Sequence, residues 1–570
     1  MNANVEIVIA NTNERVSVPQ GCRLSDLAKQ CQNMCQYPIL GALVNNELTE
    51  LQYRLYNPKC VRFIDITHKL GMRMYINSLT FMLYKAVREC YPEARLSVEH
   101  SMLNGLYCTI DKEGTPYNEL PNIDIAKTVR ERMLELEKAD LSFEHRALLL
   151  KDALKLIEHE NIPSTYRLID SLGQLYIKMH LLDGTPHKLE SQLVPSTGIL
   201  TCWDFRPFEE GFILQCPDPN HPEKLLLYQE TPKLFNIFQE HRSWVQLLQV
   251  PTINELNCTV RDHRENHFIH VAEALHEKKF ATIADQIYQR REHVKIVLLA
   301  GPSSSGKTTS CRRLAVQLSV LGFKVHQLSL DDYFVPRSKT PRDANGELDF
   351  ECIEALDIPL LNDHLLRLFK GEEVQLPTFD FLKGEPVYTG KTLCLHNTEP
   401  CAEGTVHPQP ILLIEGIHAL NPKLTTQLPD EWKFRIYVSA LTQIAIDAQN
   451  IIHSSDNRLL RRIVRDYNYR GYSAYDTLRR WDSVRSGEQK HIFPFQENAD
   501  IMFNSALLYE LGTLKPLVEP LLKKVPENTE EHAVAKRLLN FIELIEPIDT
   551  KHIPPTSILR EFLGGSSFEY

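Results

Sequence analysis

A short apolar run that leads into a glycine-bounded turn constrains the fold of this chain more than any other feature. Residues 294–300 read VKIVLLA, which is long enough for one buried strand. The next residues match the spacing G-x-x-x-x-G-K-[ST] from Gly301 to Thr308, and leucines at helical spacing follow up to Gly322. Such a unit binds phosphate, because loop N–H groups and the helix dipole both face the anion. The sequence therefore predicts a nucleoside triphosphate site.

Within this loop, individual residues have separate predicted tasks. Lys307 is expected to reach the β- and γ-phosphates, and the Thr308 hydroxyl group is expected to bind Mg²⁺. The predicted ATP-binding residues are Gly301, Pro302, Ser303, Ser304, Ser305, Gly306, Lys307, Thr308 and Thr309. The group that receives the terminal phosphate has to be inferred from other residues.

Length and charge limit the remaining classes. At 570 residues the chain is too long for one ordinary core, so two to four domains are expected. A net charge of −11 gives no overall attraction to nucleic acid. No run approaches the length of an apolar membrane span, and the first residues lack the pattern of a signal peptide. We therefore expect a cytoplasmic protein without a membrane anchor, whose 13 cysteines are reduced thiols.

Residues 1–66 have the pattern of a small β-rich unit. Strands are predicted at 5–10, 15–19, 42–45 and 61–66, with a turn at 11–14 and a helix at 25–32 capped by Ser25. This order suggests a β-grasp module. The stretches VPQGCRLSDLAKQ and GALVNNELTELQYRL resemble the TGS domain at the start of threonyl-tRNA synthetases.

Residues 67–250 extend that resemblance. A helix near 75–90, the stretch YPEARLSVEHSMLNGLYCTID and a helix at 125–137 resemble the α+β editing domain of the same family. That domain uses an H-x-x-x-H pair, and by our alignment Phe81 and Lys85 stand at these places here. Residues 193–198 supply neither the later cysteine nor the later histidine. The resemblance thus implies a binding or structural module without hydrolysis, with tRNA or a ribosomal element as its partner.

Residues 251–292 are predicted to form a helical connector between the halves. His263, His267 and His270 lie at i, i+4 and i+7, a spacing compatible with metal ligation. No cysteine or carboxylate partner is evident, so we prefer a polar face packed between domains.

From 293 to 510 the pattern alternates between strands and helices, which predicts an α/β domain with a parallel sheet. Strands are predicted at 294–300, 324–330, 411–414 and 433–438, and helices at 308–321, 359–369 and 457–469. Residues 511–570 form a predicted helical extension, divided by Pro516, Pro520, Pro526 and Pro547, with a loose end.

Two carboxylates are predicted at the carboxyl ends of strands, where an open parallel sheet binds its ligands. Asp331 follows the second strand and can accept the proton of a hydroxyl group that attacks the γ-phosphate. Asp332 is the alternative base, and turn capping is a third use of this doublet. Glu415 ends the strand at 411–414 and is expected near Mg²⁺ or its water shell.

The helix at 457–469 carries an arginine stripe. Arg458, Arg461, Arg462 and Arg465 share one face at i, i+3, i+4 and i+7, and almost no acidic partner is evident. Such a stripe usually marks a solvated surface. An unpaired set is instead typical of a lid that closes on phosphates.

In this order, the motifs GPSSSGKTT, LSLDDYF, DFECIEALD, LPTFDF, LIEGI and RLLRRIVRD resemble those of the uridine kinase/phosphoribulokinase family over 293–510. The resemblance implies a P-loop kinase that phosphorylates the 5′-hydroxyl group of a nucleoside with ATP and Mg²⁺. The implied catalytic residues are Asp331, Lys307, Arg458, Arg461 and Arg462. The implied substrate contacts are Asp331, Tyr333, Glu351 at the ribose and Phe379 at the base, and the implied metal ligands are Thr308 and Glu415.

Two departures from that family concern the substrate. Glu351 stands where aspartate is usual, and Phe379 and Gly384 stand where tyrosine and histidine bind a pyrimidine. Because Gly384 has no side chain, we expect room for a larger base and weaker selectivity for pyrimidines. A kinase of another sugar alcohol and a tRNA-linked regulatory ATPase remain alternatives, and homo-oligomer formation stays open. A GTPase is disfavoured because the chain has no N-K-x-D motif.

Overall fold

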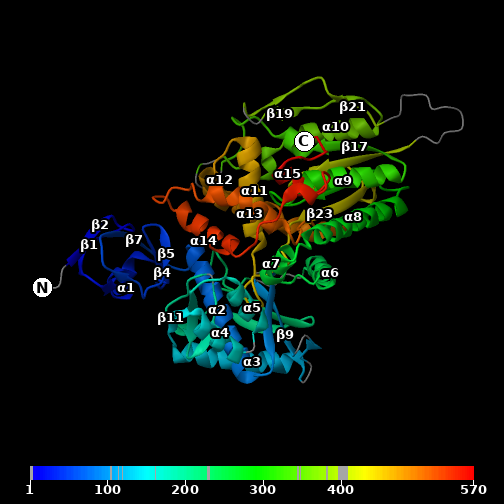
Figure 1. The fold of residues 1–570 in the computed structure, drawn as a ribbon. Helices are drawn as coiled ribbons and strands as arrows, with labels where there is room; N and C mark the ends of the chain where they lie inside the picture. Colours follow the sequence, from blue (N-terminus) through cyan, green and yellow to red (C-terminus); the bar gives the residue numbers. More distant parts are fainter. Residues whose placement is uncertain are drawn as a thin grey trace.

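A five-stranded parallel sheet forms the centre of the C-terminal half (Figure 1). The computed structural model describes residues 4–102, 105–112, 115–117, 120–160, 162–189, 191–226, 231–342, 346, 348–380, 383–395 and 408–569. The strands, in the order in which they lie in the sheet, are β17 (Phe323–Ser329), β22 (Gln409–Glu415), β16 (Ile296–Ala300), β23 (Lys433–Ser439) and β24 (Ile501–Asn504). All four neighbouring pairs are parallel, which confirms the predicted α/β class.

Helices cover both faces of this sheet. On one face lie α8 (Glu265–Gln289) and α9 (Lys307–Val320), and on the other lies α10 (Ile358–Phe369). Every residue of β16 is buried, because a central parallel strand contacts helices on both sides. Its apolar run therefore shows no alternation in the sequence.

Two helices and a C-terminal extension complete this half. The helix that carries the arginine stripe, α11 (Ser454–Arg470), is followed by α12 (Ala474–His491), α13 (Glu510–Leu522), α14 (Glu531–Glu543) and α15 (Arg560–Leu563). Pro516 and Pro520 lie inside α13 and do not separate helices, so the prediction is wrong for these two residues. Pro526 lies between α13 and α14, and Pro547 lies between α14 and α15, as predicted. The extension is packed up to Phe562, because Ile558 and Phe562 are fully buried against the core formed by α8, α9 and the sheet.

The N-terminal unit is a mixed sheet with one helix. The sheet order is β2 (Glu14–Pro19), β1 (Asn4–Ile9), β7 (Lys59–Ile64), β4 (Gly41–Val44) and β5 (Glu47–Thr49), with β1 and β7 parallel. The helix α1 (Leu24–Cys31) packs its apolar side on this sheet. Residue Arg23 is the N-cap and no side chain caps the helix, so the predicted cap at Ser25 is wrong.

A second unit joins helices to antiparallel strands. The helix α2 (Lys69–Cys90) starts earlier than predicted, because the His68 side chain accepts the N–H of Leu70. The other elements of this unit are α3 (Asn122–Ala139), α4 (Leu150–His159), α5 (Pro163–Ser171), β8 (Arg95–Met102), β9 (Gly105–Lys112), β10 (Thr115–Pro116), β11 (Phe143–Leu149), β12 (Tyr176–Leu182), β13 (Thr185–His187), β14 (Asp204–Phe208) and β15 (Gly211–Gln215). In α2, Phe81 is a core residue and Lys85 is buried in an ion pair with Glu89 at 2.9 Å.

The connector at 251–292 consists of α7 (Ile253–Arg261) and α8, and α6 (Pro232–Leu248) precedes it. His263 lies between α7 and α8 with a φ angle of +57°, so it does not share a helical face with His267 and His270. All three side chains are exposed, so the predicted packing of this face between domains is wrong. Among the described residues, no group of three metal-binding side chains forms. In the same part of the chain, no helix combines the length and the apolar character needed to span a membrane.

Candidate active site

The phosphate loop joins the end of β16 to the first turn of α9. Ser304 and Gly306 have φ angles of +57° and +78°, which curls the loop backbone. Gly301 has no room for a Cβ atom, because that atom would overlap the carbonyl oxygen of Val438 in β23. The Lys307 Nζ atom donates to the Pro302 carbonyl oxygen at 3.1 Å, so the ammonium group folds back over the loop. The loop therefore has the geometry that the motif predicts.

Glu415 lies beside the start of α9 at the carboxyl end of β22. Its Oε1 atom accepts hydrogen bonds from Ser329 Oγ at 2.9 Å and from Thr308 Oγ1 at 3.5 Å. Burial, followed by the charge of Asp331, raises the pKa of Glu415 to about 7, while Lys307 opposes that shift. A hydroxyl group and a carboxylate are hard oxygen donors, which fit Mg²⁺.

The two neighbouring aspartates differ in their surroundings. Asp331 follows β17, and its N–H donates to Ser329 Oγ at 3.3 Å. Its carboxylate has no hydrogen bond within the described part of the chain. The Asp332 carboxylate accepts the N–H of Phe379 at 3.3 Å, and burial raises its pKa. Asp331 is thus the carboxylate that is available for proton transfer.

Glu351 lies close to the same groups. Burial, followed by the Glu488 charge, raises the pKa of Glu351 to about 7, whereas Arg462 and Lys307 oppose that shift. Its Oε2 atom is buried without a hydrogen bond inside the described ranges. Tyr333 is placed differently, because its ring is buried and its hydroxyl group bonds to His364 Nδ1 at 3.0 Å.

The arginines of α11 have acidic partners, so the prediction of a nearly unpaired stripe is wrong. Arg458 Nη2 donates to Glu488 at 2.7 Å, and Arg461 Nε donates to Glu510 at 3.0 Å. Both arginines are buried, which explains the pairing, since an unpaired buried charge is very costly. Sequence inspection missed these pairs because the partners lie 30 and 49 residues away.

The same helix also contacts the phosphate loop. Arg458 Nη1 donates to the Ser303 carbonyl oxygen at 3.0 Å, and Arg462 Nη1 donates to Ser303 Oγ at 2.8 Å. Arg462 and Arg465 share the carboxylate of Asp466 at 3.2 and 2.8 Å. Arg470 lies 3.8 Å from the same carboxylate, so three guanidinium groups share one negative charge, and this excess of positive charge favours an anion near Arg462.

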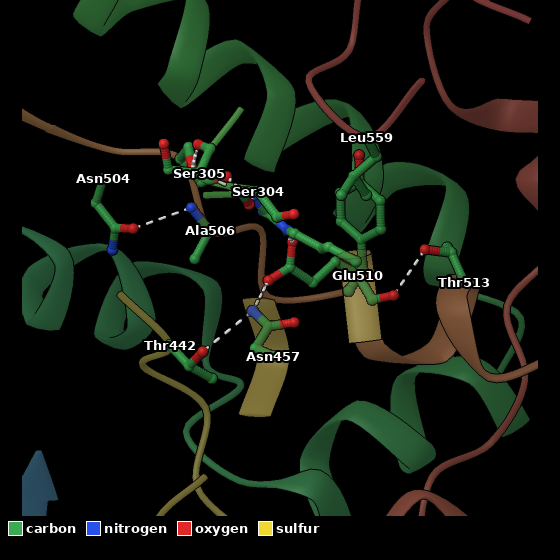
Figure 2. A network of polar contacts seen from close by, with 12 residues as sticks. Ser304, Ser305, Thr442, Asn457, Asn504, Ala506, Glu510, Thr513 and Leu559 are labelled. Atoms are coloured by element: carbon green, nitrogen blue, oxygen red, sulfur yellow. Dashed lines mark hydrogen bonds and ion pairs between the residues drawn. The ribbon is translucent and has the colours of Figure 1, made fainter. Parts of the chain in front are cut away.

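Figure 2 shows the polar network beneath the loop. Glu510 lies between Asn457 and Thr513, and Asn457 Nδ2 also donates to Thr442 Oγ1 at 3.1 Å. The network connects α11, α13 and the residues that follow β24, and it fixes the loop from below.

Residues 296–508 match the family described as Phosphoribulokinase / Uridine kinase family. This chain is 26% identical over 213 residues to the uridine kinase of Deinococcus deserti, which covers 37% of this chain and 88% of that protein. It is 27% identical over 237 residues to the uridine kinase of Chlamydia pneumoniae, which covers 41% and 92%. The C-terminal half contains a kinase domain of this family.

The N-terminal half is similar to a different enzyme. It is 25% identical over 201 residues to a threonine–tRNA ligase of Clostridium kluyveri, which covers 34% of this chain and 30% of that protein. The chain thus spans less than a third of that ligase and combines its similarity with a kinase domain.

A residue of the C-terminal extension contacts the phosphate loop of the kinase domain. Thr309 Oγ1 and N donate to Glu561 Oε2 at 2.7 and 3.4 Å, in the first turn of α9. A Cβ atom at Gly306 would contact Ile558 of the same extension. The two partners are 252 residues apart, so no local signal in the sequence could have revealed Glu561.

The predicted base pocket of the kinase domain is occupied by protein atoms. The Phe379 ring is 6% exposed and lies 5.7 Å from the Phe334 ring, centroid to centroid. A Cβ atom at Gly384 would overlap the Arg337 side chain, and Arg337 N donates to the Gly384 carbonyl oxygen at 2.9 Å. The prediction of free space at Gly384 is therefore wrong, because the Arg337 side chain fills that space.

Proposed function

We propose that this chain is an ATP-dependent nucleoside kinase that phosphorylates the 5′-hydroxyl group of its substrate. The observation that carries this proposal is the convergence of three groups at one edge of the sheet. Lys307 lies over the loop, Thr308 and Glu415 contact each other, and Asp331 has an available carboxylate beside them.

The proposed reaction is a direct transfer. The substrate oxygen forms a bond with the γ-phosphorus atom of ATP, and the bond from that atom to the β–γ bridging oxygen breaks, which releases ADP. The hydroxyl proton moves to the Asp331 carboxylate. Lys307 and Arg462 are assigned to the negative charge of the phosphates. Because Arg458 and Arg461 are paired with glutamates, they act by fixing the loop, while Arg462 is the arginine that can reach the anion.

Mg²⁺ fits the oxygen donors at this edge. Thr308 and Glu415 would hold it, and the ion would neutralise charge on the β- and γ-phosphates when bound. Gly301, Pro302 and Ser303 to Thr309 are assigned to ATP as predicted, with Glu351 at the ribose hydroxyl groups and Tyr333 and Phe379 on the substrate side.

A second candidate substrate is another sugar alcohol. The observation that favours it is the packing around Phe379 and Gly384, where the side chains of Phe334 and Arg337 leave less room for a base. Glu351 and Asp331 would still bind and deprotonate hydroxyl groups in that case.

The proposed domains are a TGS-like β-grasp unit at 1–66, an editing-like unit at 67–250, the connector at 251–292, the kinase domain at 293–510 and the extension at 511–570. The editing-like unit is proposed to bind without hydrolysis, since a core phenylalanine and an ion-paired lysine occupy the aligned positions. A tRNA or ribosomal partner and a cytoplasmic location complete the proposal.

The test is a substrate panel with the full chain, ATP and Mg²⁺. Uridine, cytidine, adenosine, guanosine, inosine and 2′-deoxyuridine are compared by kcat/KM for monophosphate formation. We expect turnover of ribonucleosides, with 2′-deoxyuridine disfavoured because Glu351 loses a hydroxyl partner. Turnover of simple sugar alcohols without any nucleoside turnover would favour the second candidate. Absence of phosphoryl transfer to either class would overturn the proposal.

A further inference from the structure

A cavity of about 90 Å³ lies between the editing-like unit and the kinase domain. Its walls are formed by residues of α2, β8, β9 and α14 and by the segment that precedes α11. Figure 1 shows α14 close to one end of α2. One water molecule needs roughly 10–15 Å³ of such volume, so the cavity has room for a ligand of about six to nine non-hydrogen atoms. None of the residues that line it belongs to the candidate active site.

The charged groups of the cavity have a positive excess. Asp456 Oδ2 accepts hydrogen bonds from Arg73 Nη2 at 2.8 Å and from Arg537 Nη1 at 2.7 Å. These two guanidinium groups hold the pKa of Asp456 far below its usual value, so its carboxylate is ionised. Two positive charges therefore face one negative charge. Arg73 has no other hydrogen bond within the described residues, which leaves further donors on its guanidinium group.

Neutral polar groups line the cavity beside Arg73. The side chains of Asn77 and His453 form no hydrogen bond with the described residues, although both line the cavity. Burial and the charge of Arg73 lower the pKa of His453 to about 3, so its ring is neutral. The lining also includes the apolar residues Val98, Leu106, Leu189, Ile446 and Phe541. The cavity thus combines donors for an anionic head with an apolar wall for a short carbon body.

We propose that this cavity is an effector site for a small organic carboxylate of amino-acid size. The excess of one positive charge matches a single carboxylate, whereas a phosphate group would bring nearly two negative charges into the same space. Arg73 and Asn77 donate to the carboxylate, and the carbon body lies against the apolar wall.

The position of Asp456 connects this site to the kinase domain. Asp456 is in the first turn of α11, and Arg458 and Arg462 of the same helix contact Ser303 in the phosphate loop. A bound carboxylate shares Arg73 with Asp456 and weakens the contact between α2 and the start of α11. Occupancy of the cavity should therefore lower the rate of phosphoryl transfer, a consequence that rests on the proposed kinase function.

Binding is tested by isothermal titration calorimetry on the full chain. L-Lactate and 3-hydroxybutyrate are the carboxylate probes, and inorganic phosphate is the anion without a carboxylate. We expect at least one carboxylate to bind at millimolar concentration or tighter. In Arg73→Gln and in Asn77→Met its affinity should fall at least tenfold. Asn77→Met keeps the Arg73–Asp456 pair and fills the cavity, so it separates ligand loss from misfolding.

Arg88→Gln is the matched control. Arg88 is also in α2 and pairs with Glu160 at 3.2 Å, but it lies outside the cavity, so this variant should bind as the unchanged chain does. If no carboxylate binds, or if the two cavity variants bind normally, the site is overturned. Binding of phosphate in place of carboxylates, with the same dependence on Arg73, would overturn the ligand class.

The coupling is measured separately. The carboxylate that binds should lower kcat/KM for ATP at least threefold in the unchanged chain and leave Asn77→Met unaffected. Carboxylate binding without any change in kcat/KM would overturn the coupling and leave the site standing. A chain that binds the carboxylate but transfers no phosphate to any acceptor would contradict the proposed function alone.

Discussion

The edge of the parallel sheet and the arginine face of α11 are both polar, yet they are held in different ways. At the edge, Glu415 is the last residue of β22 and Asp331 lies two residues beyond the end of β17, so the strand ends alone bring them together. On α11, Arg458 and Arg461 depend on glutamates from other helices. We infer that the sheet edge serves chemistry, while most of the arginine face serves to fix the loop.

The largest expected effect is at Lys307. Lys307→Ala removes the ammonium group that lies over the loop, and we expect phosphoryl transfer to fall at least 10³-fold, as for loss of a main electrostatic contact. Urea denaturation should show little change in stability, because Lys307 is only half-buried and its ammonium group donates to a single backbone carbonyl oxygen among the described residues, that of Pro302. Activity within tenfold of the unchanged chain would mean that this loop is not the ATP site.

The second effect concerns stability. Arg461→Ala leaves Glu510 buried with only Asn457 as a side-chain donor, so the free energy of unfolding should fall by about 3–5 kcal/mol. Arg465→Ala is the control on the same helix, because Asp466 keeps Arg462 as a partner, and it should cost less than about 1 kcal/mol. Equal losses measured by urea denaturation would contradict a fixing role specific to Arg461.

The third effect depends on pH. The pKa of Glu351 is raised to about 7, so the folded state favours the protonated carboxyl group. The stability that this proton contributes is present at low pH and is lost as pH rises through 7. Glu351→Gln should therefore gain stability over the unchanged chain, by about 2 kcal/mol at pH 8 and by much less at pH 5. A difference in Tm that does not grow with pH would show that Glu351 has an ordinary pKa.

The smallest effect is at Glu561. The Glu561 carboxylate adds negative charge to the first turn of α9, where the negatively charged phosphates of ATP must also bind. Glu561→Gln keeps an acceptor for Thr309 but removes the charge, so KM for ATP should fall about three- to tenfold, which corresponds to roughly 1 kcal/mol. Glu546→Gln, in the same extension and paired with Arg261, is the control and should leave KM unchanged. A rise in KM for Glu561→Gln would show that its charge aids ATP binding.

The features that could be predicted from the sequence are those that neighbouring residues determine. The strands that flank the loop, the loop itself, Asp331 and Glu415 all follow from local pattern, and the structure brings them to one edge. The unpredicted features arise from contacts between distant residues. Glu488 and Glu510 neutralise the arginines, Glu561 reaches Thr309 across 252 positions, and Arg337 fills the space at Gly384.

The central claim is that Asp331 is the base of a phosphoryl transfer at the sheet edge. Single-turnover rates with ATP, Mg²⁺ and the best acceptor test it most directly, for Asp331→Asn and for Asp332→Asn. We predict that Asp331→Asn slows the transfer about 10²–10⁴-fold with unchanged ATP affinity, since only the proton acceptor is lost. Asp332→Asn should retain most of the rate, because its contact with Phe379 N–H needs only an acceptor oxygen. A slow Asp332→Asn beside a normal Asp331→Asn would contradict this account.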